Sequence, residues 1–212
     1  MHVPPETKFG GNMRGFFIVL LAGLAALTGC KQKSASSPAD AVQAADCGAQ
    51  AVSSWEIAAG QVYEISATSA GPDCAKAVIA LAVRGPDGNP LFVAATKAQD
   101  SGLAFNGAQG RQDMQARLQD WIAPAQAGFT TSADLPAWPE GATGPAAKPA
   151  EGVSGTFPFY PEAEAYGERA SYEALRSAKA PVFCYVQGPE SFACLAAQDG
   201  SVFPIGLQVF PG

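Results

Sequence analysis

The sequence predicts an α+β domain, in which a small antiparallel sheet of meander and hairpin strands packs with one or two amphipathic helices. Three observations lead to this prediction. Short apolar or alternating runs, typical of strands, follow one another with turn sequences between them. Two segments have helical periodicity instead. Four cysteines fit two disulfides, and a long Pro/Gly-rich loop interrupts the pattern.

Residues 1–29 contain the parts of a secretory signal peptide. A short basic start at Met13 precedes about a dozen apolar residues, from Phe16 to Leu27. Small residues then lead to Cys30. The residues ahead of Met13 do not strengthen the signal, so Met13 is the expected start of translation.

The end of this segment, Leu-Thr-Gly-Cys, resembles the lipobox of bacterial lipoproteins. The resemblance implies that the signal peptide is cut before Cys30, that Cys30 carries a diacylglycerol through a thioether, and that its amino group is acylated, as with palmitate. The alternative is a transmembrane helix, but spanning needs roughly 20 apolar residues and this run is shorter. Two or three acyl chains on one residue would anchor the protein permanently in the membrane.

Residues 30–45 contain the lipidated cysteine and a polar tether rich in Ser and Ala. Such a segment is expected to be flexible, with a root-mean-square span of roughly 20 Å. Lys31 follows the cysteine, whereas an Asp at this place tends to mark inner-membrane retention in the lipoprotein class. By that resemblance we expect an anchor in the outer membrane, with the domain facing the periplasm.

The first part of the domain, from about Asp46 to Gly128, begins with a predicted β-meander. Val62–Thr68 alternates loosely, and both Ala77–Val83 and Leu91–Thr96 are continuous apolar runs. The Gly-Pro-Asp-Gly-Asn-Pro sequence between the last two predicts a hairpin turn, because Pro presets φ, Asp caps the turn and Gly tolerates positive φ. This turn chemistry explains the loop without a ligand.

Arg111–Ala123 changes to a helical period and is followed by a proline. Met114, Leu118 and Trp121 lie on one face, and an Asp and an Arg four residues apart on the other face predict an ion pair. We expect Trp121 to anchor this helix in the core rather than to bind a ligand.

Ser132–Pro161 is rich in Pro, Gly and Ala and lacks periodicity, which predicts a long loop or linker inside the domain. The segment contains four aromatic residues: Trp138, Phe157, Phe159 and Tyr160. They could dock on the domain or contact a partner. We expect docking, because exposed Trp and Phe are costly in an exported protein.

The last part of the chain starts with a short predicted helix, Arg169–Lys179, followed by four short strand-like runs. The runs are Val182–Gln187, Phe192–Ala197, Val202–Ile205 and, as the weakest, Leu207–Phe210. At about 45 residues this part is too small for a core of its own, so it should pack on the first sheet. We therefore predict one α+β domain over residues 46–212.

With Cys30 assigned to lipid, four of the five cysteines remain: Cys47, Cys74, Cys184 and Cys194. An even number in an oxidising compartment predicts two disulfides. No Cys-x-x-Cys spacing occurs, so we expect no metal site.

The spacing of the last two cysteines favours one pairing. A three-residue Gly-Pro-Glu loop between strands would set Gln187 opposite Ser191, and Cys184 would then lie directly opposite Cys194. Opposed residues are close enough for a disulfide. Cys47 is then left to pair with Cys74.

Charge and histidine content exclude several function classes. The formal net charge is −6, and no basic patch offers a surface for nucleic acid. The single histidine, His2, precedes the signal segment, so the mature protein would have no imidazole. Ser-His-Asp and Cys-His catalysis, His-ligated zinc and His-ligated haem are therefore excluded. We expect no cofactor.

The acidic residues are scattered, with one local concentration next to two tyrosines. This candidate surface site consists of Glu162, Glu164, Glu168, Tyr160 and Tyr166. It could take a cation or a substrate, and the alternative is a solvated face.

Two function classes remain. The first is a non-catalytic envelope lipoprotein, a binding or accessory protein whose partner is an envelope protein or polymer. The alternative is a His-independent, carboxylate-based enzyme that acts on envelope material. Acidic residues with perturbed pKa values in a cleft would favour the enzyme, and an open aromatic or apolar patch would favour the binding protein.

Overall fold

The computed structural model describes residues 47–124, 127–147 and 157–210. The predicted signal peptide, Cys30 and the tether lie outside these residues and stay predictions. None of the helices in the described part of the chain is long and apolar enough to cross a membrane.

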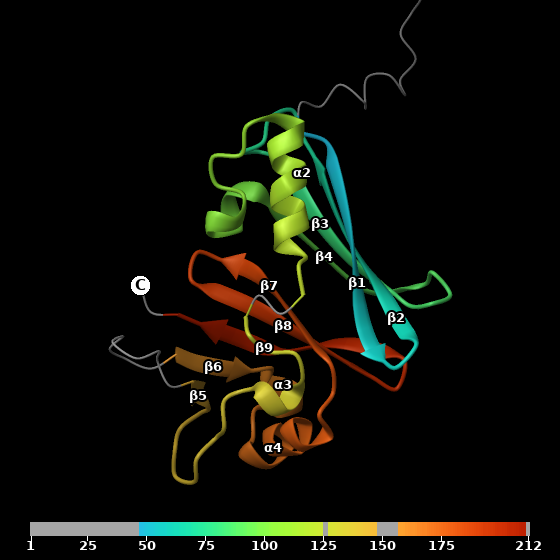
Figure 1. Ribbon diagram of the computed structural model, residues 1–212. Helices are drawn as coiled ribbons and strands as arrows, with labels where there is room; N and C mark the ends of the chain where they lie inside the picture. Colours follow the sequence, from blue (N-terminus) through green and yellow to red (C-terminus); the bar gives the residue numbers. More distant parts are fainter. Residues whose placement is uncertain (1–46, 125–126, 148–156, 211–212) are drawn as a thin grey trace, which may run out of the picture. The chain divides into compact units, whose positions relative to one another are not determined.

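The first sheet is a four-stranded antiparallel meander whose strands lie in chain order (Figure 1). Its strands are β1 (Ala49–Ala58), β2 (Gln61–Ala70), β3 (Val78–Arg84) and β4 (Pro90–Lys97). The three predicted strands are confirmed, and β1 is an additional one. Of its inward positions, only Ala51 and Trp55 are fully buried, and Ser53 lies between them. Small inward residues hide the alternation that marks a strand in sequence.

The predicted turn between β3 and β4 is confirmed. The Gly85 N–H donates to the Asn89 carbonyl at 3.0 Å, and the Asp87 carboxylate accepts the Asn89 N–H at 3.1 Å. Gly88, which lies between Asp87 and Asn89, has a φ of +78°. The Gly/Pro sequence therefore closes a hairpin, as its turn chemistry predicts.

Helix α2 (Gly110–Trp121) packs against β1 and β2 (Figure 1). Its buried residues are Met114, Leu118 and Trp121, the face that the periodicity predicts. The expected ion pair also forms, with Arg117 Nε 3.1 Å from Asp113 Oδ1. Trp121 is a core residue.

The second sheet has five antiparallel strands in the order β5-β6-β9-β8-β7. Its strands are β5 (Ala146–Ala147), β6 (Phe157–Pro161), β7 (Val182–Gly188), β8 (Ser191–Gln198) and β9 (Ser201–Val209). The two short runs expected at the C-terminal end form the single strand β9. A register shift opposite Pro204 and Gly206 breaks its apolar pattern into two.

The expectation of a loop over the whole of Ser132–Pro161 is wrong at its C-terminal end. Residues Phe157–Pro161 form strand β6 on the edge of β9, and two prolines in five residues conceal this strand in the sequence. At the other end, Leu135 is buried, and the Trp138 ring lies 5.9 Å from that of Tyr172. The expected docking of Trp138 is thus confirmed.

A one-turn helix α3 (Ala163–Tyr166) follows β6 and was not predicted. Helix α4 (Arg169–Ala178) confirms the predicted helix, with Tyr172 and Leu175 buried. It ends at Lys179, whose φ of 52° is left-handed, a common helix stop.

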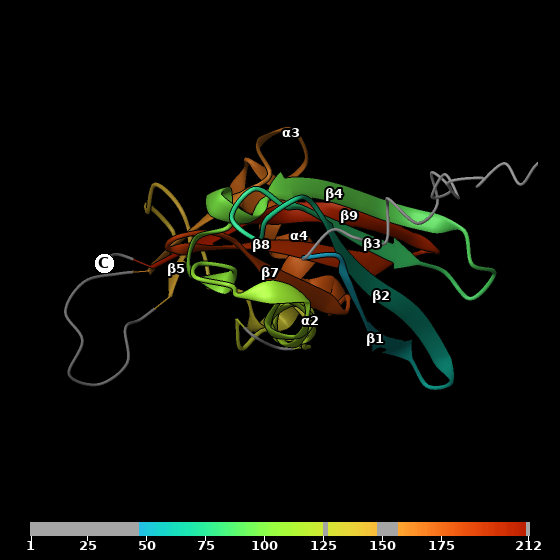
Figure 2. The same ribbon diagram turned by 90° about the horizontal axis from the view of Figure 1, so that it is seen from above.

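Strand β7 is buried on both faces and joins two core clusters. Phe183 and Tyr185 point to the cluster shared with the first sheet and α2, where the Phe183 ring lies 5.8 Å from that of Trp55. Val182 and Cys184 point to the opposite cluster, which α4 covers. The last segment therefore packs on the first sheet, as its small size predicts (Figures 1 and 2).

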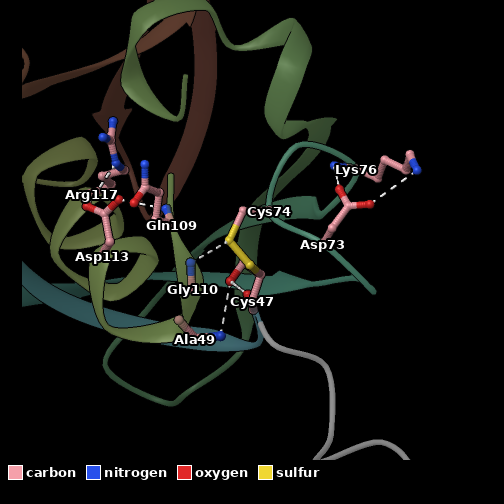
Figure 3. Close-up of a disulfide and its surroundings, with 10 residues drawn as sticks. Cys47, Ala49, Asp73, Cys74, Lys76, Gln109, Gly110, Asp113 and Arg117 are labelled. Carbon is pink, nitrogen blue, oxygen red and sulfur yellow. Dashed lines mark hydrogen bonds and ion pairs between the residues drawn. A yellow bond between two sulfur atoms is a disulfide. The ribbon is translucent and has the colours of Figure 1, made fainter. Parts of the chain in front are cut away.

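Both predicted disulfides are present. Cys47, directly before β1, is bonded to Cys74 in the connection between β2 and β3 (Figure 3). Cys184 and Cys194 lie directly opposite each other with Cα atoms 4.1 Å apart. Because Ala197 N–H bonds the Pro181 carbonyl, Cys184 and Cys194 fall at a non-hydrogen-bonded pair, where strands approach most closely.

The expected hairpin loop between these cysteines needs one correction. Gly188, not Gln187, lies opposite Ser191, and the register shifts between Val186 and Gly188. Gln187 is therefore an extra residue in β7. The shift lies beyond the disulfide, so the predicted cysteine pairing holds.

Candidate binding groove

The acidic and aromatic residues proposed from the sequence lie in the stretch of chain that runs from β6 to the start of α4. Tyr160 is in β6, Glu164 and Tyr166 are in α3, and Glu162 and Glu168 each precede a helix. The three carboxylates are exposed. Their ability to bind a cation or substrate stays a prediction.

Only one of these side chains has a distinctive environment. Tyr166 packs 6.3 Å from Phe203 between ring centroids, and burial raises the pKa of its phenol. Within the described residues, no three acidic, Cys or His side chains gather closely enough to hold a metal ion. The group is thus a solvent-facing surface around a short helix.

A different part of the molecule is hollowed. The 3₁₀ turn at Gly102–Ala104 faces the β7–β8 hairpin, and a hollow of about 420 Å³ lies between them. Its walls are mainly apolar. They are formed by Leu103, Ala104, Val186, Gly188, Pro189, Glu190, Ser191, Phe192 and Phe210.

A second hollow of about 430 Å³ shares Leu103, Ala104 and Val186 with the first. Its other walls come from α2 and include Asp113, Arg117, Asp120, Trp121 and Ala116. We call the two adjoining hollows the Leu103 groove. One end of this groove is apolar and the other carries the charges of α2.

A glycine brings the two sides of the groove together. Gly102 has a φ of +58°, and a Cβ atom there would lie 2.5 Å from the Cα of Pro189. Only glycine can combine this conformation with so close a backbone approach. The turn is therefore packed directly on the tip of the hairpin.

Leu103 is held out from this turn into solvent. It is 75% exposed, although Ser101 and Phe105 on either side are buried. The Phe105 ring packs 5.2 Å from that of Trp121, whose own ring packs 5.5 Å from that of Tyr185. The backbone on both sides of Leu103 is thus fixed by buried residues, and the leucine side chain is exposed on the turn.

Trp121 connects the wall of the groove on α2 to the second sheet. Its indole Nε1–H donates to the Val186 carbonyl on the edge of β7 at 2.7 Å. The bond ties the end of α2 to the hairpin, so both walls of the groove belong to one packed unit. The same bond covers part of the free edge of β7.

The charged end of the groove has more acidic than basic groups. Asp113 accepts the Gln109 N–H at 2.8 Å and pairs with Arg117, and these two interactions lower the pKa of its carboxyl (Figure 3). Arg117 is thus already partnered within the chain. Asp120 and, at the apolar end, Glu190 are exposed.

Five carboxyl groups have lowered pKa values, each mainly through a backbone N–H, which is local in the chain for all but Glu173, whose donor is Trp138. They are Asp73, Asp87, Asp113, Asp134 and Glu173. Hydrogen bonds of this kind favour the charged form. A general acid needs the opposite shift, so the four aspartates fit turn and cap roles, and Glu173 fits a role in holding the Trp138 segment on α4.

Sequence reasoning missed the groove because its walls come from segments that are distant along the chain. Leu103 stands alone between small residues, and neither Val186 nor Phe210 has a distinctive neighbourhood in sequence. Only Trp121 carried a signal, as a core residue of a helix. Comparisons with protein-family models, with curated proteins and with solved structures gave no match.

Proposed function

We propose that this protein is an exported lipoprotein, anchored through Cys30 in the outer membrane with its domain facing the periplasm. Its role is non-catalytic: it binds or assists another envelope component, a protein or a polymer. The signal segment and its Leu-Thr-Gly-Cys end are the sequence basis for this proposal.

The use of the cysteines supports export most directly. Two disulfides pair four of the five cysteines, and disulfides persist in oxidising compartments such as the periplasm. The cysteine left over is Cys30, the residue that the lipobox assigns to lipid. An oxidising compartment thus accounts for the four disulfide-bonded cysteines, and the lipid anchor accounts for Cys30.

The Leu103 groove supports the binding role. Its apolar end adjoins an acidic end, and the exposed Leu103 side chain lines both. Such a surface suits recognition of a partner.

Expression of the full chain with Cys30→Ser tests the anchor. We expect the variant to remain an uncut precursor without lipid, as read from the intact mass and from partition into detergent. Lys33→Ser is the control, and it should be processed and lipidated like the parent chain. Ordinary processing and detergent partition of the Cys30→Ser protein would refute the assignment.

Lys31→Asp tests which membrane holds the anchor. The lipoprotein resemblance leads us to expect that this variant moves to the inner membrane while the parent chain fractionates with the outer membrane. Density-gradient separation of the two membranes measures this. Parent protein found in the inner-membrane fraction would refute the proposed location.

A further inference from the structure

We infer that the Leu103 groove binds an extended peptide segment of a partner protein in which an apolar residue stands two positions from a Lys or Arg. The inference rests on the proposed binding role and specifies the chemistry of the partner. It depends on the two adjoining hollows, one apolar and one acidic.

The apolar end would take the apolar side chain of the partner. Phe192 and Phe210 line it, with their ring centroids 5.4 Å apart in an edge-to-face pair. Leu103 adds its exposed side chain from the opposite wall. Both walls are preorganised by the Gly102 contact and the Trp121 bond, so binding needs little ordering of the groove.

The charged end would take the cation. Asp113 and Asp120 line this hollow with one basic residue, Arg117, and Asp113 already pairs with that arginine, while Glu190 lines the adjoining hollow. The groove therefore has an excess of negative charge that a Lys or Arg of the partner would offset. Because the two hollows share three residues, two side chains on the same face of an extended peptide, which stand two residues and about 6.6 Å apart, can reach both.

Charge also argues against a second copy of this chain as the occupant. The chain has a formal net charge of −6, so two copies would bring like charges together at the acidic end. A partner with basic residues lowers this repulsion instead. It should bind less tightly as salt rises, because the charged end is open to solvent.

The test uses the full lipidated chain in nanodiscs of neutral phosphatidylcholine and three short fluorescein-labelled peptides. The Leu/Lys peptide repeats Leu-Ser-Lys-Ser, the second repeats Leu-Ser-Glu-Ser and the third repeats Ser-Ser-Lys-Ser, so that Leu and the charged residue share a face when the peptide is extended. Fluorescence anisotropy gives their dissociation constants. We expect the Leu/Lys peptide to bind about tenfold more tightly than either of the others, because only it satisfies both ends of the groove.

Two pairs of variants localise the binding. Leu103→Ala should weaken binding of the Leu/Lys peptide about tenfold. The control Val93→Ala truncates a 62% exposed side chain on β4 and should leave the affinity unchanged. Asp120→Asn should weaken binding of the same peptide about threefold, whereas Glu56→Gln, at an exposed position on β1, should have no effect. All four side chains are exposed, so the fold should be kept.

Three results would overturn the inference. They are equal affinity for the three peptides, no response to Leu103→Ala, and equal losses from Asp120→Asn and Glu56→Gln. A photo-crosslinker at position 103 in cells gives a further check. A crosslink only to this chain's own residues or to another copy would refute a separate partner protein.

The outcome can be separated from that of the anchor experiment. If the parent chain has no lipid and behaves like the Cys30→Ser variant, the proposed location is refuted. Peptide affinities measured on the same folded chain would still decide the chemistry of the groove.

Discussion

The two sheets of this protein are assembled by different means. In the first sheet each strand pairs with its neighbour along the chain, from β1 to β4. In the second sheet β6 joins β9, which lies beyond two helices and two other strands in the sequence. Local pairing can be read from turn and strand patterns, whereas the distant pairing depends on the packing of the whole domain.

The largest effect should come from breaking the connection between the second sheet and α2, the helix that packs on the first sheet. Trp121→Ala removes three interactions: the bond to the Val186 carbonyl and the ring contacts with Phe105 and Tyr185. We expect the free energy of unfolding to fall by about 4 kcal/mol. Urea unfolding measures this loss. Trp121→Phe is the control: it keeps an aromatic ring in the core and should cost less, and an equal cost would contradict the role of the rings.

The disulfides give the next comparison, one for each sheet. Cys47–Cys74 spans 27 residues and Cys184–Cys194 spans 10. Replacing both cysteines of a pair by Ala should cost about 3.5 kcal/mol for the first and about 2.7 kcal/mol for the second, because the longer loop restricts the unfolded chain more. Urea unfolding of the two double variants measures these losses. The reverse order would show that strain or native contacts outweigh chain entropy.

Gly206→Ala tests the distant pairing of β6 with β9. Gly206 has a φ of +146°, and a Cβ atom there would collide with the Tyr160 carbonyl and the Phe159 ring. We expect a loss of about 2 kcal/mol, together with faster hydrogen exchange in β6 than in the first sheet. Gly144→Ala, where a Cβ atom would meet nothing within 4 Å, is the control and should be neutral.

The smallest expected effect concerns the contact between Trp138 and helix α4. The Glu173 carboxylate accepts the Trp138 N–H at 2.8 Å and pairs with Arg176, and these interactions lower its pKa below the ordinary value of 4.5. A lowered pKa in the folded state stabilises the protein above that ordinary value, and this gain is lost as the pH falls through the folded-state pKa.

Glu173→Gln should therefore reduce stability by less than about 1 kcal/mol at neutral pH, because the pair is partly exposed. The difference from the parent chain should vanish in acid. Thermal melts at neutral and acidic pH measure it, with Glu162→Gln as the exposed control. A difference between parent and Glu173→Gln that does not change with pH would contradict the role of the charge.

The comparison of the two sheets also explains what could be predicted from sequence. The Cys184–Cys194 pair was predictable because one short hairpin sets its register. The face of α2 was predictable because Met114, Leu118 and Trp121 repeat with the helical period. In both cases the necessary information lies within a few turns of helix or a few strand residues.

Other features were hidden for physical reasons. Strand β1 has small inward residues, and β6 contains two prolines that suggest a loop. The Leu103 groove has no local signature at all. Its walls meet only because Gly102 allows the backbone to approach Pro189, a contact that no spacing in the sequence encodes.

The position of the first disulfide has a mechanical consequence. The covalent loop from Cys47 to Cys74 encloses the whole β1–β2 hairpin. In the proposed anchored protein, a pulling force from the membrane would arrive at Cys47 and pass through the sulfur bridge to Cys74. The hairpin would then be shielded from tension, and the first strands could not be peeled away from the anchored end while the bridge is intact.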